Sequence, residues 1–269
     1  MALWKKFRPA VWVVFKKEAT LQPHRHRYWL NANPDDPVEF KQQVTYICQL
    51  HQKALELLTQ GIHLVSTDEM SGIQALERLH PTLPMRPKRV ERIEFEYIRH
   101  GTQTLLANWH VAKGQVLNPT IGATRSEEDF KNHIAQTLDT DPDAGWIFIV
   151  DQLNIHKSES LVRLIAERCG IKTDLGIKQK TGLLKSMKTR AAFLSDSNHR
   201  IRFIYIPKHT SWLNQIECWF SILMRRLLKR GNFTSTQDLK QKILNFIAYY
   251  NCTFAKPFQW KFEGFPDVG

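Results

Sequence analysis

The chain has 269 residues, 42% of them hydrophobic, and its 38 Lys and Arg against 26 Asp and Glu give a net charge of +12. This composition is typical of a folded protein with one large core or two smaller ones, and it argues against intrinsic disorder. The longest apolar runs, residues 11–15 and 146–150, are far too short to span a bilayer, and no secretory signal is present. We therefore expect a cytoplasmic protein without a membrane partner.

The positive charge is concentrated in the second part of the sequence. Residues 1–150 carry 18 basic and 17 acidic side chains, a net of +1, whereas residues 151–269 carry 20 and 9, a net of +11. A polyanion such as DNA would neutralise such a surface and release counterions on binding. The alternative is that the basic surface serves solubility alone.

The first half of the chain predicts, in order, a helix, a strand, a hairpin, a second helix and a strand buried on both faces. Their ranges are 37–60, 62–65, 102–111 with 114–124, 126–138 and 146–150. The helices follow from apolar residues at helical spacing, with Gly61 ending the first and Ser126 capping the second. The last strand is an unbroken apolar run that ends at Asp151.

The second half predicts a helix, a basic segment without a clear period, a strand and two more helices. Their ranges are 158–168, 169–200, 200–207, 213–230 and a final helix capped by Ser235. This order of strands and helices points to an α/β sandwich.

Three carboxylates stand where charged side chains are costly. Asp68 and Asp151 each follow an apolar strand, and Glu217 lies on the apolar side of the helix over 213–230. For Asp68 alone, the simpler interpretation is a turn or a helix cap. Together the three can form an oxygen cluster of the kind that Mg²⁺ prefers, and two such ions about 3.5–4 Å apart can clamp the attacking and leaving oxygens of a phosphodiester.

Four segments carry a family resemblance. They are STDE at 66–69, IFIVDQLNIHKS at 147–158, IPKHTSWLNQIECWFSIL at 206–223 and NFIAYYNCTFAKPFQW at 245–260. In this order they resemble the catalytic region of mariner-superfamily DDE transposases, in the bacterial insertion-sequence branch. The resemblance runs from about Leu21 to about Phe262.

This resemblance implies an α/β, RNase H-like fold with a mixed central sheet flanked by helices. It also implies that Asp68, Asp151 and Glu217 are a catalytic triad that binds Mg²⁺ or Mn²⁺, as a pair of ions. His156 matches the family's histidine after the second Asp, and we expect it to orient a metal-bound water or a phosphate. The implied activity is DNA strand cleavage and strand transfer into TA dinucleotides. The implied partners are the element ends, the target DNA and further copies of the chain, at the bacterial nucleoid.

The sequence departs from the family pattern in three places. Gln152 stands where the family usually has Asn after the second Asp, and a basic insertion at about 169–200 lengthens the interval to Glu217. The helix-turn-helix DNA-binding modules usually found upstream are largely missing. The expected divisions are a remnant of the DNA-binding region with a linker helix over 1–60, the catalytic domain over 61–262 and a tail over 263–269.

Candidate DNA contacts are basic or lie in the segment that leads into Glu217. They are Lys178, Lys180, Lys185, Lys188, Arg190, Lys208, His209, Trp212, Asn214, Arg225 and Arg226. Arg225 and Arg226 are equally compatible with a solvated helix end that balances the helix dipole. The insertion carries seven basic against two acidic residues, and we expect it to contact DNA rather than to complete the core. The alternative is an extra layer packed by Leu183, Leu184, Met187 and Phe193.

Other metal patterns are weaker. Residues 139–145 faintly resemble a calcium loop, but Pro142 interrupts them and the twelfth position lacks Glu, so we predict a turn. One zinc-like group of residues, without a known spacing, consists of His24, His26, Cys48 and His51. We interpret these residues as nucleic-acid contacts or solvated groups instead. The cysteines are widely scattered and predict free thiols at 48, 169, 218 and 252.

Two other functions are compatible with the sequence. One is a non-catalytic or truncated DNA-binding remnant of a transposase, and the other is a different RNase H-like, metal-dependent nuclease. The intact carboxylates favour an enzyme over a remnant.

Overall fold

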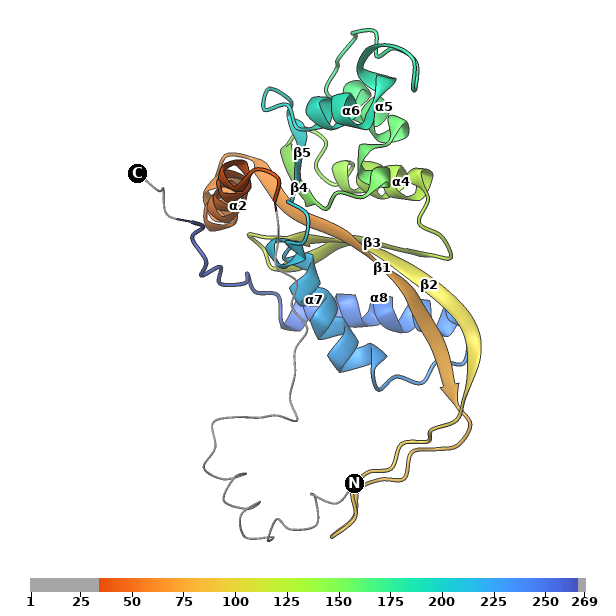
Figure 1. Cartoon of the computed structure of the whole chain (residues 1–269). Helices are drawn as coiled ribbons and strands as arrows, with labels where there is room; N and C mark the ends of the chain where they lie inside the picture. The colour runs from red at the N-terminus through yellow and green to blue at the C-terminus, as the bar shows by residue number, and fades with distance from the viewer. Residues whose placement is uncertain (1–33, 266–269) are drawn as a thin grey trace, which may run out of the picture. The chain divides into compact units, whose positions relative to one another are not determined.

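The computed structural model describes residues 34–265, in which five strands form a central sheet (Figure 1). The strands are β1 Ile62–Arg78, β2 Tyr97–His110, β3 Gln115–Gly122, β4 Gly145–Val150 and β5 Ile201–Tyr205, in the spatial order β3-β2-β1-β4-β5. β1 is antiparallel to β2, and β2 to β3, whereas β4 is parallel to both β1 and β5. The predicted mixed sheet and its hairpin are confirmed.

β1 is much longer than the sequence indicated. The strand was expected to end before Asp68, but it continues to Arg78 because β2 extends back to Tyr97 and pairs with it. Asp68 lies opposite Ala107 within this ladder, so its placement after a strand end was wrong. β4 accompanies β1 only from Ile62 to Ser66.

Helices cover both faces of the sheet (Figure 1). One face packs against α2 Pro37–Gln52, α3 Ala54–Thr59, α7 Ile216–Leu223 and α8 Thr236–Thr253, and the other against α4 Glu127–Leu138, α5 Glu159–Arg168 and α6 Met187–Leu194. Each face of the sheet has its own hydrophobic core, the first core under α2, α3, α7 and α8 and the second core under α4, α5 and α6. In β4, Ile147 and Ile149 belong to the first core, whereas Trp146, Phe148 and Val150 belong to the second. A strand covered on both faces has no solvent side, which accounts for its unbroken apolar run.

Two helices differ from their expected ranges. The helix expected over 37–60 is divided at Lys53, although its N–H still bonds to the Gln49 carbonyl at 2.9 Å. The helix expected over 213–230 consists of a 3₁₀ turn at Ser211–Leu213, then α7, then a π-helical segment at Met224–Leu228. The predicted caps are confirmed, since Ser126 and Ser235 each accept a backbone N–H bond at the start of α4 and α8.

The basic insertion completes the second core. Its 3₁₀ turn at Gly182–Lys185 and α6 bury Leu184, Phe193 and Leu194. The expectation that this segment lies outside the core was therefore wrong, and the alternative of an extra packed layer is correct. The reason is that its apolar residues turn inward, while its lysines at 178, 180, 185 and 188 stay exposed.

Smaller predictions are also settled. Residues 139–144 form turns, and the four cysteines are free. No helix in the range 34–265 is long and apolar enough to cross a membrane. The division of the chain into domains stays a prediction; α2 contributes Val44, Ile47 and Cys48 to the same core as the sheet.

Candidate active site

The pairing of β1 with β4 brings Asp68 level with Asp151. Ser66 lies opposite Ile149 in this parallel ladder. Asp68 is two residues beyond Ser66, and Asp151 is two residues beyond Ile149. The same register therefore places both aspartates where the two strands separate.

Asp68 is 8% exposed and is held by two hydrogen bonds. Its Oδ1 accepts from the Glu69 backbone N–H at 2.8 Å, and its Oδ2 accepts from Asn214 Nδ2 at 3.1 Å. The same Nδ2 donates to the Thr67 carbonyl at 3.0 Å. Because Asn214 stands three residues before Glu217, these bonds attach the start of α7 to β1.

Glu217 lies half-buried in the first turn of α7. It lines a shallow hollow of about 290 Å³, and Met70 and Arg225 also line it. Met70 is two residues beyond Asp68 on β1, so the two side chains leave the strand on the same face. The three predicted carboxylates thus lie in one region.

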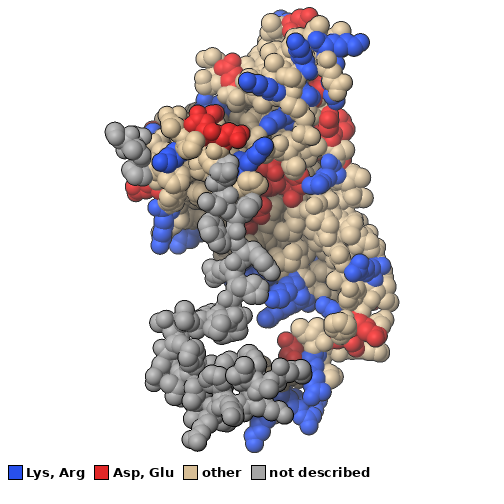
Figure 2. Space-filling view, in the orientation of Figure 1, with Lys and Arg blue, Asp and Glu red and all other residues tan. Residues whose placement is uncertain are grey.

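These carboxylates repel one another. Burial and the negative charges of Glu69, Asp151 and Glu217 raise the pKa of Asp68 to about 7, and burial together with Asp151 raises the pKa of Glu217. Figure 2 shows acidic side chains gathered near the middle of the visible face, with Lys and Arg groups around them. His156 and Arg125 pair with Glu69, and His156 also pairs with Asp151, whereas Asp68 and Glu217 have no ion-pair partner in the described part of the chain. The charges of Asp68 and Glu217 beside Asp151 are therefore unfavourable unless a further cation offsets them.

The donor set fits a divalent cation. Carboxylate oxygens are the ligands that Mg²⁺ and Mn²⁺ prefer. Asn214 Oδ1 is buried without a hydrogen-bond partner, and its orientation is fixed because Nδ2 faces two acceptors. Among residues 34–265, however, no three His, Cys, Asp or Glu side chains are close enough to form a finished metal site. The carboxylates therefore lie in one region, but their side chains do not surround a single ion position.

His156 is buried between the carboxylates of Asp151 and Glu69. Its Nδ1 lies 2.8 Å from Asp151 Oδ1, its Nε2 lies 3.3 Å from Glu69 Oε2, and the Phe130 ring packs on the imidazole at 4.4 Å. Burial favours the neutral imidazole, but the two carboxylates raise the pKa of His156 to about 9. Burial alone would raise the pKa of Asp151, and the bonds from His156 and the Leu153 N–H instead hold it below its usual value.

The burial of His156 favours a positioning role. Its side chain is 0% exposed and that of Glu69 is 1% exposed, so neither faces an incoming phosphate. Glu69 was not predicted as a site residue. The sequence signal for Glu69 was its position directly after Asp68 in a strand. Successive side chains of a strand point to opposite faces, so the two carboxylates of this pair have different surroundings. Arg125 Nη1 also lies 3.3 Å from Glu69 Oε1.

Lys157 places positive charge beside Asp151, and Lys208 lies near Lys157. Burial and Lys208 lower the pKa of Lys157, and Asp151 acts in the opposite direction. The Lys157 ammonium donates to Gln152 Oε1, and Gln152 Nε2 donates to the Ile206 carbonyl at 2.9 Å. The amide that replaces the expected Asn therefore joins the ends of β4 and β5.

The candidate DNA contacts fall into two groups. Arg190 is 5% exposed, with Nε donating to the Ser186 carbonyl at 3.3 Å, and Asn214 is buried on Asp68. These contacts favour structural roles for the two residues. The remaining candidates are exposed: Lys178, Lys180, Lys185, Lys188, Lys208, His209, Trp212, Arg225 and Arg226.

The weak zinc set is not assembled in the described part of the chain. His24 and His26 lie outside the described residues. Cys48 and His51 are buried, and His51 Nε2 donates to the Leu213 carbonyl at 2.8 Å. This half of the set contributes to packing around α2.

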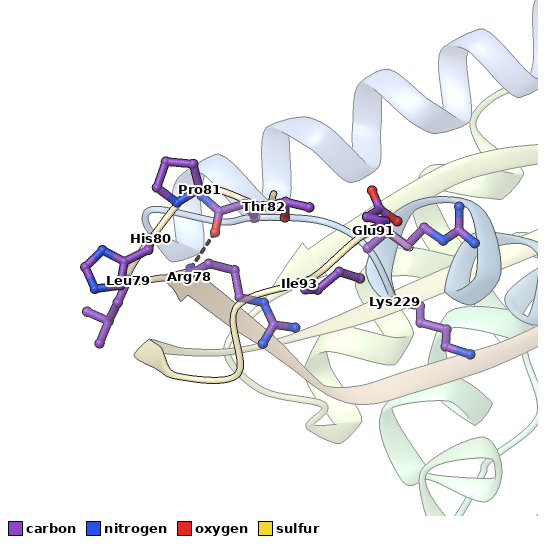
Figure 3. Close-up of a pocket in the computed structure, with 10 residues that line it drawn as sticks. Arg78, Leu79, His80, Pro81, Thr82, Glu91, Ile93 and Lys229 are labelled. Carbon is purple, nitrogen blue, oxygen red and sulfur yellow. Dashed lines mark hydrogen bonds between the residues drawn. The ribbon is translucent and has the colours of Figure 1, made fainter. Parts of the chain in front are cut away.

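A separate hollow of about 480 Å³ lies at the far end of β1 (Figure 3). Arg78 and His80 line it from the β1 side, Lys229 from the end of the helix after α7, and Glu91 from the connection to β2. Ten strand residues, about 30 Å, separate Arg78 from Asp68. This hollow therefore does not coincide with the carboxylate cluster.

Comparisons with known proteins show the family and the fold. Residues 63–240 match the family described as DDE superfamily endonuclease, whereas no curated protein matches the chain. Among solved structures, the Mos1 mariner paired end complex with Mn is similar at a TM-score of 0.55 and 12% identity, over 89% of this chain and 63% of that chain. A pre-cleavage Mos1 transpososome is similar at a TM-score of 0.50 and 11% identity, over 89% and 63%. The chain thus spans less than two thirds of these matched chains, and their similarity confirms the predicted RNase H-like α/β fold.

Proposed function

The chain belongs to the DDE superfamily of endonucleases, and we propose that it is the catalytic domain of a mariner-superfamily DNA transposase, in the bacterial insertion-sequence branch. The observation that carries this proposal is the gathering of Asp68, Asp151 and Glu217 from three separate elements into one mutually repelling cluster. A cluster of this composition is useful to a protein that binds divalent cations and is unfavourable otherwise.

In the proposed site, Asp68, Asp151 and Glu217 hold two divalent ions, Mg²⁺ or Mn²⁺. When bound, such ions activate the attacking oxygen and offset the charge of the scissile phosphate. Asn214 fixes Oδ2 of Asp68, and His156 fixes Oδ1 of Asp151. These partners orient both aspartates before DNA arrives.

The proposed reaction has two steps at the same carboxylates. In the first, a water oxygen forms a bond to a backbone phosphorus and the bond from phosphorus to the 3′ oxygen breaks, which leaves a 3′ hydroxyl and a 5′ phosphate. In the second, that 3′ hydroxyl oxygen bonds to a phosphorus of the target DNA. The 3′ oxygen of the target leaves and takes up a proton. We propose TA dinucleotides as targets on the motif resemblance alone.

The proposed partners are the element ends, the target DNA and further copies of the chain, at the bacterial nucleoid. DNA binding is supported by the net charge of +11 over residues 151–269. The similar solved structures are described as a paired end complex and a transpososome. Contact between copies is supported by the exposed apolar side chains that precede β2, such as Met85 at 75% and Phe95 at 87%.

A strand-transfer assay tests the proposal. We expect the chain to join a pre-cut oligonucleotide with a free 3′ hydroxyl to plasmid DNA in Mg²⁺ or Mn²⁺, and not in EDTA. The pre-cut end supplies the 3′ hydroxyl and so removes the need for the first cleavage step. Glu217→Gln, purified in parallel, controls for contaminating nucleases and should be slower by about 10³-fold or more, because a metal ligand contributes several kcal/mol.

The outcomes separate the alternatives. DNA binding without metal-dependent chemistry would favour a non-catalytic remnant. Nicking without joining would favour another RNase H-like nuclease. Equal joining by the Glu217→Gln chain would exclude the proposed triad.

The insertion is expected to contact DNA through its exposed lysines. Replacing Lys178, Lys180, Lys185 and Lys188 by Gln should weaken DNA binding and reduce the slope of log K against log salt by about 0.9 for each phosphate that the lysines no longer neutralise. The melting temperature should hardly change, because these side chains are exposed. A matched variant replaces the same number of exposed lysines elsewhere, at 41, 53, 256 and 261. Equal slopes for both variants would show that only net charge matters.

A further inference from the structure

We propose that Trp212 stacks on an unpaired base of the DNA next to the scissile phosphate, an inference that rests on the proposed function. Trp212 lies in the 3₁₀ turn Ser211–Leu213 and is 46% exposed. A large aromatic ring left half in solvent forgoes burial that would stabilise the fold. Its exposure is useful when a ligand covers it.

Two aromatic rings of the C-terminal segment pack against Trp212. Trp260 lies parallel to it, with 5° between the planes and 6.3 Å between the centroids, and Phe262 meets it edge-on at 5.4 Å. Trp260 packs in turn on His51 at 4.5 Å, and His51 bonds to the Leu213 carbonyl. The indole is therefore supported in place, and stacking on it requires little further ordering.

The location joins this aromatic surface to the carboxylates. Trp212 is two residues from Asn214, at most about 7 Å along the chain, and Asn214 Nδ2 donates to Asp68 Oδ2. On the other side, exposed Lys208 lies near Lys157, and the charge of Lys157 acts on Asp151. Trp212 for a base, Lys208 for the backbone and the carboxylates for the phosphodiester thus lie on neighbouring segments of the fold.

The chemistry selects an unpaired base. In a duplex, neighbouring base pairs cover both faces of each base, so a side chain cannot stack on them. A base in an unpaired overhang, a bulge or a separated strand presents a free face, and stacking on an aromatic side chain contributes about 1–3 kcal/mol with little dependence on sequence. Phosphate contacts are made by Lys, Arg and other polar side chains and by backbone N–H groups, not by the face of an indole ring.

Binding measurements in EDTA test this proposal without any cleavage. The probes are two labelled DNA duplexes of equal length, one fully paired and one with a single unpaired base. Trp212→Ala should bind the second about 5- to 150-fold more weakly, and the fully paired duplex less than about 2-fold more weakly. Trp212→Phe should retain most of the affinity, since phenyl also stacks. Tyr249→Ala removes another exposed aromatic, 55% exposed on α8, and should bind both DNAs as the parent does.

A fluorescent base gives a second readout. 2-Aminopurine at the unpaired position should be quenched on binding the parent chain and not on binding Trp212→Ala. Equal weakening of binding to both duplexes, or none, would overturn the proposal, and so would a change in oligomeric state without a change in DNA binding. Because metal is absent, this result is independent of strand transfer. If Glu217→Gln joined DNA as well as the parent, the proposed triad would fail while the stacking measurement still stood.

Discussion

Asp68→Asn is expected to abolish strand transfer and, at the same time, to raise the melting temperature of the metal-free chain. Burial, and to a smaller extent the negative charges of Glu69, Asp151 and Glu217, raise the pKa of this carboxyl to about 7. A raised carboxyl pKa means that folding becomes less favourable as the pH rises from about 4 to about 7, and the full penalty applies above pH 7. About three pH units correspond to about 4 kcal/mol. Asn satisfies only one of the two donors that Asp68 satisfies, which costs about 1 kcal/mol, so a net gain of about 2–3 kcal/mol is expected.

Thermal melts in EDTA from pH 4 to pH 8 check this result. The difference between Asp68→Asn and the parent should be large at pH 8 and should vanish near pH 4, where the parent carboxyl is protonated. Mg²⁺ should raise the melting temperature of the parent and not that of the variant. Asp143→Asn makes the same charge change at an exposed turn position and should leave the melting temperature nearly unchanged. A less stable Asp68→Asn chain at pH 8 would contradict the repulsion argument.

The sequence predicted β4 and Asp151 because a strand buried on both faces is apolar throughout. It did not predict the length of β1, whose second half contains Gly72 and several polar residues. That half is a strand because β2 pairs with it from the other end of a long connection. Pairing between distant segments leaves little trace in either segment alone.

The candidate site shows the same division. Asp68, Asp151 and Glu217 were predicted because each places a charge next to apolar neighbours. The partners of these carboxylates depend on contacts across the fold: Glu69 meets His156 from another element, and Trp260 backs Trp212 from the C-terminal segment. The packing of the insertion at 169–200 was not predicted. Its seven basic residues indicated an exposed segment, but the few apolar ones, such as Leu184 and Phe193, pack in the core.

His156→Gln is expected to destabilise the chain by about 3–5 kcal/mol. Glu69 and Asp151 both contact the imidazole, and removal of the positive partner from a buried ion pair leaves an uncompensated charge. Glu69→Gln should also destabilise the chain, because it leaves the imidazolium with one carboxylate. The double variant should lose less than the sum of the two, by about 1–3 kcal/mol, because neither charge then stands alone. Urea unfolding of all four chains measures this coupling.

Metal dependence separates a positioning role from a purely structural one. If His156 orients Asp151 for its ligand role, His156→Gln should need about 10- to 100-fold more Mg²⁺ for half-maximal strand transfer, as is typical when the partner of a metal ligand is removed. The double variant should regain stability without regaining this metal affinity, because Asp151 still lacks its partner. Glu159→Gln breaks an exposed ion pair with Arg163 and should cost less than about 1 kcal/mol, with no change in the Mg²⁺ requirement. If the double variant instead recovered stability and metal affinity together, the bridge would serve folding alone and Asp151 would be oriented by other contacts, such as the bond that its Oδ1 accepts from the Leu153 N–H.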